Sequence, residues 1–95
     1  MTPHDVDCPG ISPHVAPLAA DRVALAWEAQ SRGPYRVLDY TCSCLAVYYE
    51  LVQVGGLQQI HKVIQSEPEQ HMFTEAWRAE KARYWWRLLL MGGAR

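Results

Sequence analysis

Hydrophobic residues recur with a helical period near the start of this chain. The apolar side of this segment consists of Ala20, Val23, Ala24 and Trp27, and the polar residues point elsewhere. Pro17 suits the first turn of a helix because it lacks an N–H that would find no partner there. A Gly-Pro pair follows residue 32 and is a typical stop signal. We therefore expect a first helix over residues 17–32.

Residues 36–66 fit two different structures. Apolar residues recur there at i, i+4, i+7, i+11 and i+14, the period of a helix, and these are Leu38, Cys42, Leu45, Tyr49 and Val52. The composition favours strands instead, because β-branched and aromatic residues precede the pair Gly55-Gly56, a typical two-residue hairpin turn. The helical interpretation leads to an all-α bundle of three or four helices, and the strand interpretation leads to an α+β fold.

A hairpin around this glycine pair has one definite register. Pairing Val54 with Leu57 gives a mostly apolar face that collects Val47 with Ile64, Leu51 with Ile60 and Tyr49 with Lys62. The other face is mixed and collects Tyr48 with Val63, Glu50 with His61 and Val52 with Gln59. We favour the hairpin because both faces pair sensibly.

The remaining segments complete an α+β fold. Turn residues over 66–69 precede a segment, 71–77, that could add a third strand, and residues 80–91 form a strong helix closed by a glycine pair. We expect an N-terminal helix, an antiparallel hairpin extended to a three-stranded sheet, and a C-terminal helix packed on the sheet. Residues 1–16 are rich in proline without apolar periodicity, so we interpret them as a flexible leader before a single small domain, 17–95.

Two stretches resemble a class of small uncharacterised actinobacterial proteins. They are YYELVQVGGLQQIHK (48–62) and AWRAEKARYWWRLLLMGGAR (76–95), similar to a YEL…GGL…I hairpin and an EAR..W..LL.G.AR-like helix. The likeness implies a hairpin followed by a helix and brings no activity, cofactor or catalytic residue. The order of elements is also similar to that of double-stranded RNA-binding domains. The basic residues that open their last helix are represented here only by EKAR (80–83), so no function is carried over.

The bulk properties narrow the class of protein. The 95 residues are 49% hydrophobic and 20% charged, which is typical of a globular protein. The formal net charge of -1 disfavours a dedicated nucleic-acid binder, because binding to phosphates normally needs a surplus of basic residues. Three cysteines, no signal-peptide pattern and no membrane-length apolar run predict a cytoplasmic protein with reduced thiols and no membrane contact. There is no phosphate loop, dinucleotide fingerprint, GxSxG or HExxH motif. We therefore predict a small non-enzymatic interaction or regulatory protein without a cofactor.

The C-terminal helix has more apolar circumference than one sheet can cover. One stripe holds Ala82, Trp85, Trp86 and Leu89, and a second holds Tyr84, Leu88 and Met91. The second stripe should be covered by the first helix, by another copy, or by a protein partner. The candidate interface for a homodimer or a protein partner is Tyr84, Trp86, Leu88 and Met91.

The same helix carries basic residues among aromatic ones. These are Arg78, Lys81, Arg83 and Arg87, which are candidate contacts for a single-stranded nucleic acid. Glu75 and Glu80 can instead pair with them at helical spacing as a solvated face. Nucleic-acid binding is therefore an alternative that we do not favour.

Two further groups could carry chemistry. Cys42 and Cys44 could place two thiolates on one face of a strand, and Cys8, His4 and His14 could complete a zinc site. The usual paired CxxC spacing is missing and buried ordinary cysteines are commoner, so we assign no metal and keep a small zinc protein as a second alternative. His61 beside Glu50 resembles a catalytic base and its orienting group, but a cross-strand pair is the commoner arrangement.

Overall fold

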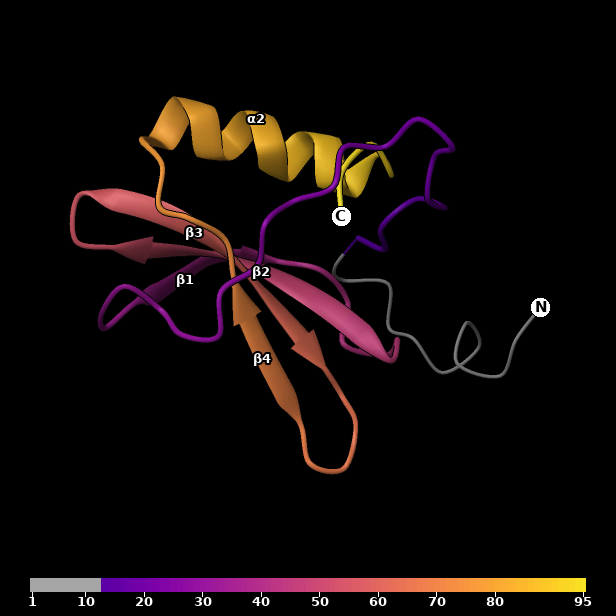
Figure 1. Cartoon of the computed structure of the whole chain (residues 1–95), viewed down its shortest axis with the longest axis horizontal. Helices are drawn as coiled ribbons and strands as arrows, with labels where there is room; N and C mark the ends of the chain where they lie inside the picture. Colours follow the sequence, from indigo (N-terminus) through magenta and orange to yellow (C-terminus); the bar gives the residue numbers. More distant parts are fainter. Residues whose placement is uncertain (1–12) are drawn as a thin grey trace.

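The structure, a computed structural model, describes residues 13–95. Its elements are β1 (Arg36–Tyr40), β2 (Val47–Val54), β3 (Leu57–Ile64), β4 (Gln70–Phe73) and α2 (Ala79–Leu90). The strands form one antiparallel sheet in the order β1-β2-β3-β4, and α2 lies across one face of it (Figure 1). The α+β class with a C-terminal helix on an antiparallel sheet is thus confirmed, and the all-α alternative is wrong.

The hairpin of β2 and β3 has the register predicted from the sequence. Val54 pairs with Leu57, and the pairing runs without a break to Val47 and Ile64. Gly55 has a φ of 59°, in the left-handed region where glycine carries no steric penalty. The turn therefore starts the pairing in a register that sends Leu51 to the same face as its partner across the hairpin.

The core lies between this hairpin and α2. From the sheet it takes Tyr49, Leu51 and Ile60, and from the last part of the chain it takes Trp77, Ala82, Trp86 and Leu89. The buried residues of the helix follow an i, i+4, i+7 spacing, which places them on one side of the helix. Ile60 and Leu89 are both fully buried, and removing each from water contributes about 1.5–3 kcal/mol.

The helix predicted over 17–32 is wrong, because this segment is extended or irregular in the structure. Its backbone groups bond to distant parts of the chain. The N–H of Val23 donates to Gly93 (2.8 Å), and Glu28 and Phe73 exchange two bonds of 2.6 and 2.7 Å. The helical period of the apolar residues was therefore overridden by tertiary pairing. Leu25 and Trp27, two positions apart, are the large side chains of this segment that pack against the core.

The sheet also differs at its edges from the prediction. A strand at 36–40 was not predicted, and all five of its residues are exposed, so it lacks the apolar alternation that marks a half-buried strand. The strand expected within 71–77 is β4, which ends at Phe73. The flexible leader predicted for 1–16 lies mostly outside the described residues.

The second face of the sheet is covered by the segment that leads into β1. The backbone N–H of Arg32 donates to Oε1 of Gln59 (3.1 Å), and the amide of Gln59 donates to the carbonyl of Thr74 (2.6 Å). The ring of Tyr35 lies 5.7 Å from that of Phe73. Buried polar groups on this face are thus satisfied by hydrogen bonds, as burial requires.

The packing predicts where the chain is sensitive to truncation. Leu89→Ala removes a fully buried side chain from the core and should lower the free energy of unfolding by about 2–5 kcal/mol. Met91→Ala, at a position 66% exposed, should change it by less than about 0.5 kcal/mol. Urea unfolding followed by tryptophan fluorescence measures both, and equal losses would contradict the described core.

Candidate functional site

Two thiols lie in the loop between β1 and β2, and this loop is anchored at both ends. At its start the N–H of Thr41 donates to the carbonyl of Tyr49 (2.8 Å), whose own N–H donates to the Thr41 hydroxyl (2.9 Å). At its end the amide of Gln65 donates to two loop carbonyls, those of Ser43 and Leu45, at 2.7 Å each. Cys42 and Cys44 are therefore held by a rigid loop, and the prediction that they share a strand is wrong.

The N-terminal segment brings His14 to the same loop. The N–H of Cys42 donates to the carbonyl of Pro13 (2.9 Å), and the N–H of Ala16 donates to the carbonyl of Leu90 at the end of α2 (2.8 Å). His14 lies between these two anchors. Its Nε2 is 3.2 Å from the Sγ of Cys44. Segments about thirty residues apart along the chain thus meet at one point.

The three side chains have the geometry of a metal-binding set. The ligand atoms of His14, Cys42 and Cys44 all lie within 4.8 Å of one another. Tetrahedral zinc, with Zn–S near 2.3 Å and Zn–N near 2.0–2.1 Å, separates its ligand atoms by roughly 3.5–3.8 Å. Changes of about 1 Å or less in the distances between ligand atoms would therefore fit all three around one ion. Two thiolates and one imidazole are ligands suited to zinc, whereas calcium and magnesium prefer oxygen.

Burial differs among these three ligands. Cys42 is buried, Cys44 is half-buried and His14 is exposed, so the site lies at the surface with one side toward solvent. A structural zinc site has four ligands. The sequence offers Cys8 and His4 as candidates for the fourth, and both lie outside the described residues.

A second cluster of ionisable groups lies on the opposite face of the sheet from α2. Nδ1 of His61 is 2.8 Å from Oε1 of Glu50, which confirms the predicted cross-strand pair. Nε2 of His61 is 2.9 Å from Nδ1 of His71, whose Nε2 is 3.0 Å from Oε1 of Glu69. Both ring nitrogens of His61 are engaged, so the arrangement does not support the catalytic interpretation of this pair.

Burial also changes the titration of the central ring of this cluster. His61 is buried on this face of the sheet, and burial lowers its pKa because the charged imidazolium loses hydration. The hydrogen bond to Glu50 offsets this lowering of the pKa in part.

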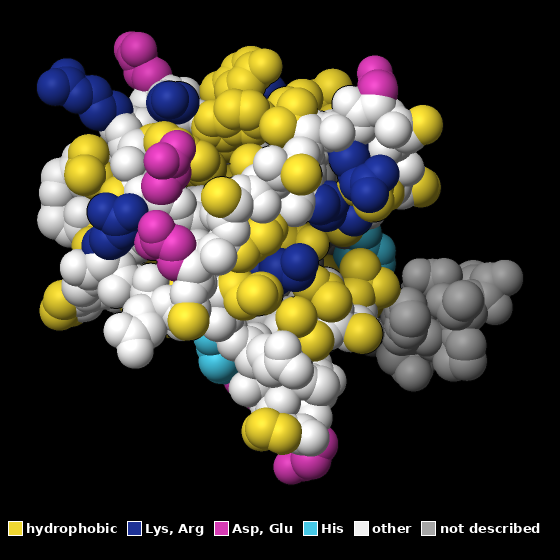
Figure 2. Space-filling view, in the orientation of Figure 1, with side chains coloured by type: hydrophobic (Ala, Val, Ile, Leu, Met, Phe, Trp, Pro, Cys, Tyr) yellow, Lys and Arg dark blue, Asp and Glu magenta, His cyan; other side chains and the backbone are white. Residues whose placement is uncertain are grey.

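The predicted interface on α2 is divided in the structure. Tyr84 and Met91 are 59% and 66% exposed, and Leu88 is half-buried. Trp86 is only 5% exposed, and its indole N–H donates to Oδ2 of Asp39 (3.2 Å). Placing Trp86 at a partner interface was therefore wrong. Figure 2 shows hydrophobic side chains gathered over α2 on this face of the molecule.

The four predicted nucleic-acid contacts do not form one patch. Lys81 lines a hollow beside the segment 23–26, whereas Arg83 and Arg87 line a hollow on the β1 side of the helix. Arg78 is exposed and lies just before the helix. Residues two positions apart on a helix point in nearly opposite directions, which explains the separation.

Comparison of the sequence with protein-family models, with curated proteins and with solved structures found no match. Within the part of the chain that is described, no helix has both the length and the apolar character that crossing a membrane requires. The resemblance to small actinobacterial proteins stays a prediction.

The buried ring of His61 predicts a pH dependence of stability. Because the pKa of His61 is lowered in the folded chain, the unfolded chain takes up a proton near pH 6.5 that the folded ring resists. This part of the stability is present above that pH and is lost as pH falls. His61→Gln should therefore lose less unfolding free energy than the unchanged protein between about pH 7.5 and 5.5.

A matched variant makes this measurement specific. His71→Gln changes the exposed ring and keeps His61 buried, so it should keep the greater acid sensitivity. Urea titrations of all three proteins at both pH values give the comparison. If the His61→Gln variant and the unchanged protein lost the same unfolding free energy between the two pH values, the His61 ring would not be the cause of the acid sensitivity.

Proposed function

We propose that this chain is a small zinc-binding protein in which the metal joins the N-terminal segment to the β1–β2 loop. The observation that supports it is the convergence of three donors, from His14, Cys42 and Cys44, within 4.8 Å. Hydrogen bonds of the surrounding backbone hold these donors, so little of the metal's binding free energy is needed to order the site. A reducing compartment, such as the predicted cytoplasm, suits this function because thiolates must stay reduced to bind zinc.

The role of the metal that fits this position is structural. The described N-terminal segment has no helix or strand before β1. A metal that binds the folded chain and not the unfolded chain would add its binding free energy to the stability of the fold. A domain of 95 residues has a modest core, and small domains often gain stability from such cross-links. Zinc here would fix the shape of a binding protein.

Metal content tests this proposal. Protein purified without chelators should contain about one zinc per chain by elemental analysis, and removal of the metal should lower the midpoint of thermal unfolding. Cys44→Ser should lose most of the zinc because serine is a poor ligand for it. Ser43→Ala, which alters the exposed neighbouring side chain in the same loop, should retain it. The absence of stoichiometric zinc from the unchanged protein would contradict the proposal.

Association through the outer side of α2 is a second candidate function. It is supported by the exposure of two large apolar side chains, Tyr84 and Met91, next to the half-buried Leu88. Leu88 also packs over the backbone at Gly93, where a Cβ would lie 2.8 Å from its Cδ1. A charge at Leu88 would therefore disturb the fold, and the two exposed residues are better positions for a test.

Light scattering decides this second function. The unchanged protein should be a dimer at micromolar concentrations, and Tyr84→Glu with Met91→Glu should make it monomeric, because two charges would have to be buried. Arg78→Glu, an exposed position at the start of the helix, should leave the dimer intact. A monomeric unchanged protein that captures no partner in a pull-down would count against association through this surface.

A further inference from the structure

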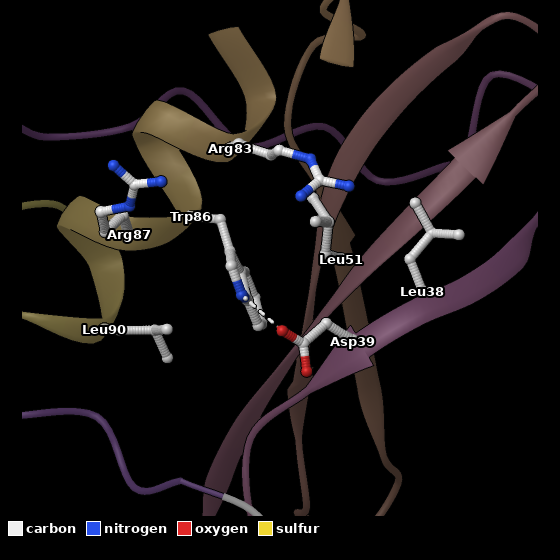
Figure 3. A pocket seen from close by; sticks show the side chains of 7 residues that line it. All are labelled: Leu38, Asp39, Leu51, Arg83, Trp86, Arg87 and Leu90. Carbon is white, nitrogen blue, oxygen red and sulfur yellow. Dashed lines mark hydrogen bonds between the residues drawn. The ribbon is translucent and has the colours of Figure 1, made fainter. Parts of the chain in front are cut away.

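A groove lies between β1 and α2, with a volume of about 290 Å³. The sheet contributes Leu38, Asp39 and Leu51 to its lining, and the helix contributes Arg83, Trp86, Arg87 and Leu90. Figure 3 shows the arginines projecting from the helix, while Trp86 points toward Asp39 at the base of the groove. The groove therefore combines apolar side chains with two cationic groups along its helical side.

A β-bulge in β1 shapes the sheet side of this groove. The pairing of β1 with β2 shifts between Val37 and Asp39. In a regular strand, neighbouring side chains point to opposite faces, yet Leu38 and Asp39 both line the groove. The bulge thus re-aims one side chain, as bulges beside binding sites commonly do.

The charges of the groove leave its two arginines available to an anion. The Asp39 carboxylate accepts hydrogen bonds within the chain at both oxygens, from the Tyr40 N–H at 2.9 Å and from the Trp86 indole at 3.2 Å. Arg83 and Arg87 form no ion pair with any of residues 13–95. The groove therefore has two positive charges on its helical side against the single negative charge of Asp39, whose oxygens both accept hydrogen bonds within the chain.

One edge of the sheet is partly covered by another segment of the chain, and the other edge is open within the described residues. At the β4 edge, Glu28 exchanges backbone hydrogen bonds with Phe73 and so covers part of that strand. No residue of the described chain pairs with the outer edge of β1. An open edge presents backbone donors and acceptors that an added strand can use. This open edge borders the groove.

We propose that the β1 edge and the groove together bind an extended, acidic peptide segment of a partner protein. Such a segment would pair with β1 through its backbone, insert apolar side chains against Leu38 and Leu90, and direct carboxylates to the two arginines. This site uses none of the metal ligands, so it stands apart from the zinc proposal.

Two other occupants fit this surface less well. A nucleic acid would need rings on which its bases could stack, but the aromatic side chain in the groove, Trp86, is 5% exposed. A second copy pairing edge to edge would bring the arginines of its own groove, and not an array of carboxylates, toward Arg83 and Arg87. Charge and shape together therefore favour an acidic peptide.

The test uses a synthetic eight-residue peptide of alternating valine and aspartate. The peptide is added to the full-length protein, whose zinc content has been measured. Amide chemical shifts should move for residues of β1 and the facing side of α2, with saturable binding. Arg83→Glu combined with Arg87→Glu should weaken binding about tenfold or more, because two attractive contacts become repulsive. Arg78→Glu combined with Lys81→Glu changes the net charge equally outside the groove and should weaken binding by less than about threefold.

Four outcomes would overturn the proposal. They are equal binding of a peptide with lysine in place of aspartate, shifts confined to other parts of the chain, tighter binding of a single-stranded oligonucleotide at the same residues, and equal weakening by the two double variants. The zinc content of each variant is measured in parallel. Loss of peptide binding with zinc retained then separates failure of this site from failure of the metal site.

Discussion

The packing of one hairpin face against α2 is the interaction on which the rest of the structure depends. Leu51 and Ile60 lie opposite each other on this face and meet Trp86 and Leu89 from the helix. Moving the hairpin by one residue would turn this face toward the other side and expose its apolar side chains. The register set by the turn at Gly55 must therefore be the one that turns the apolar face of the hairpin toward α2.

This packing also fixes where the two ends of the described chain meet. Gly92 follows α2 with a φ of 81° and approaches the backbone of Pro17 so closely that a Cβ would lie 2.1 Å from its carbonyl oxygen. The segment after the helix then pairs with Val23. The same close approach anchors the residues beside His14, so the end of the helix helps to position a candidate zinc ligand. Through this contact, the proposed metal binding would be coupled to the stability of the fold.

The two proposed sites use opposite properties of β1 and its neighbours. After β1, the loop is held by hydrogen bonds to β2 and to Gln65, which gives the rigidity that a metal site needs. The outer edge of β1 is unpaired within the described chain, and its bulge turns Leu38 into the groove. A rigid sheet with an open edge is suited to binding an extended segment, because the sheet loses little conformational entropy on binding. One short strand thus connects the proposed metal site with the proposed peptide-binding surface.

By itself, the sequence determined the elements that depend on residues close together along the chain. The glycine pair after Val54 set the register of the hairpin, and the apolar period with its closing glycines located α2 to within one residue at each end. Tertiary structure alone decided the rest. Residues 17–32 have a helical period, but their backbone bonds to Gly93 and Phe73, and no local pattern reports such distant partners. For the same reason, the sequence could not show that His14 meets Cys42 and Cys44. The distance between these ligands depends on how segments that are distant along the chain pack together.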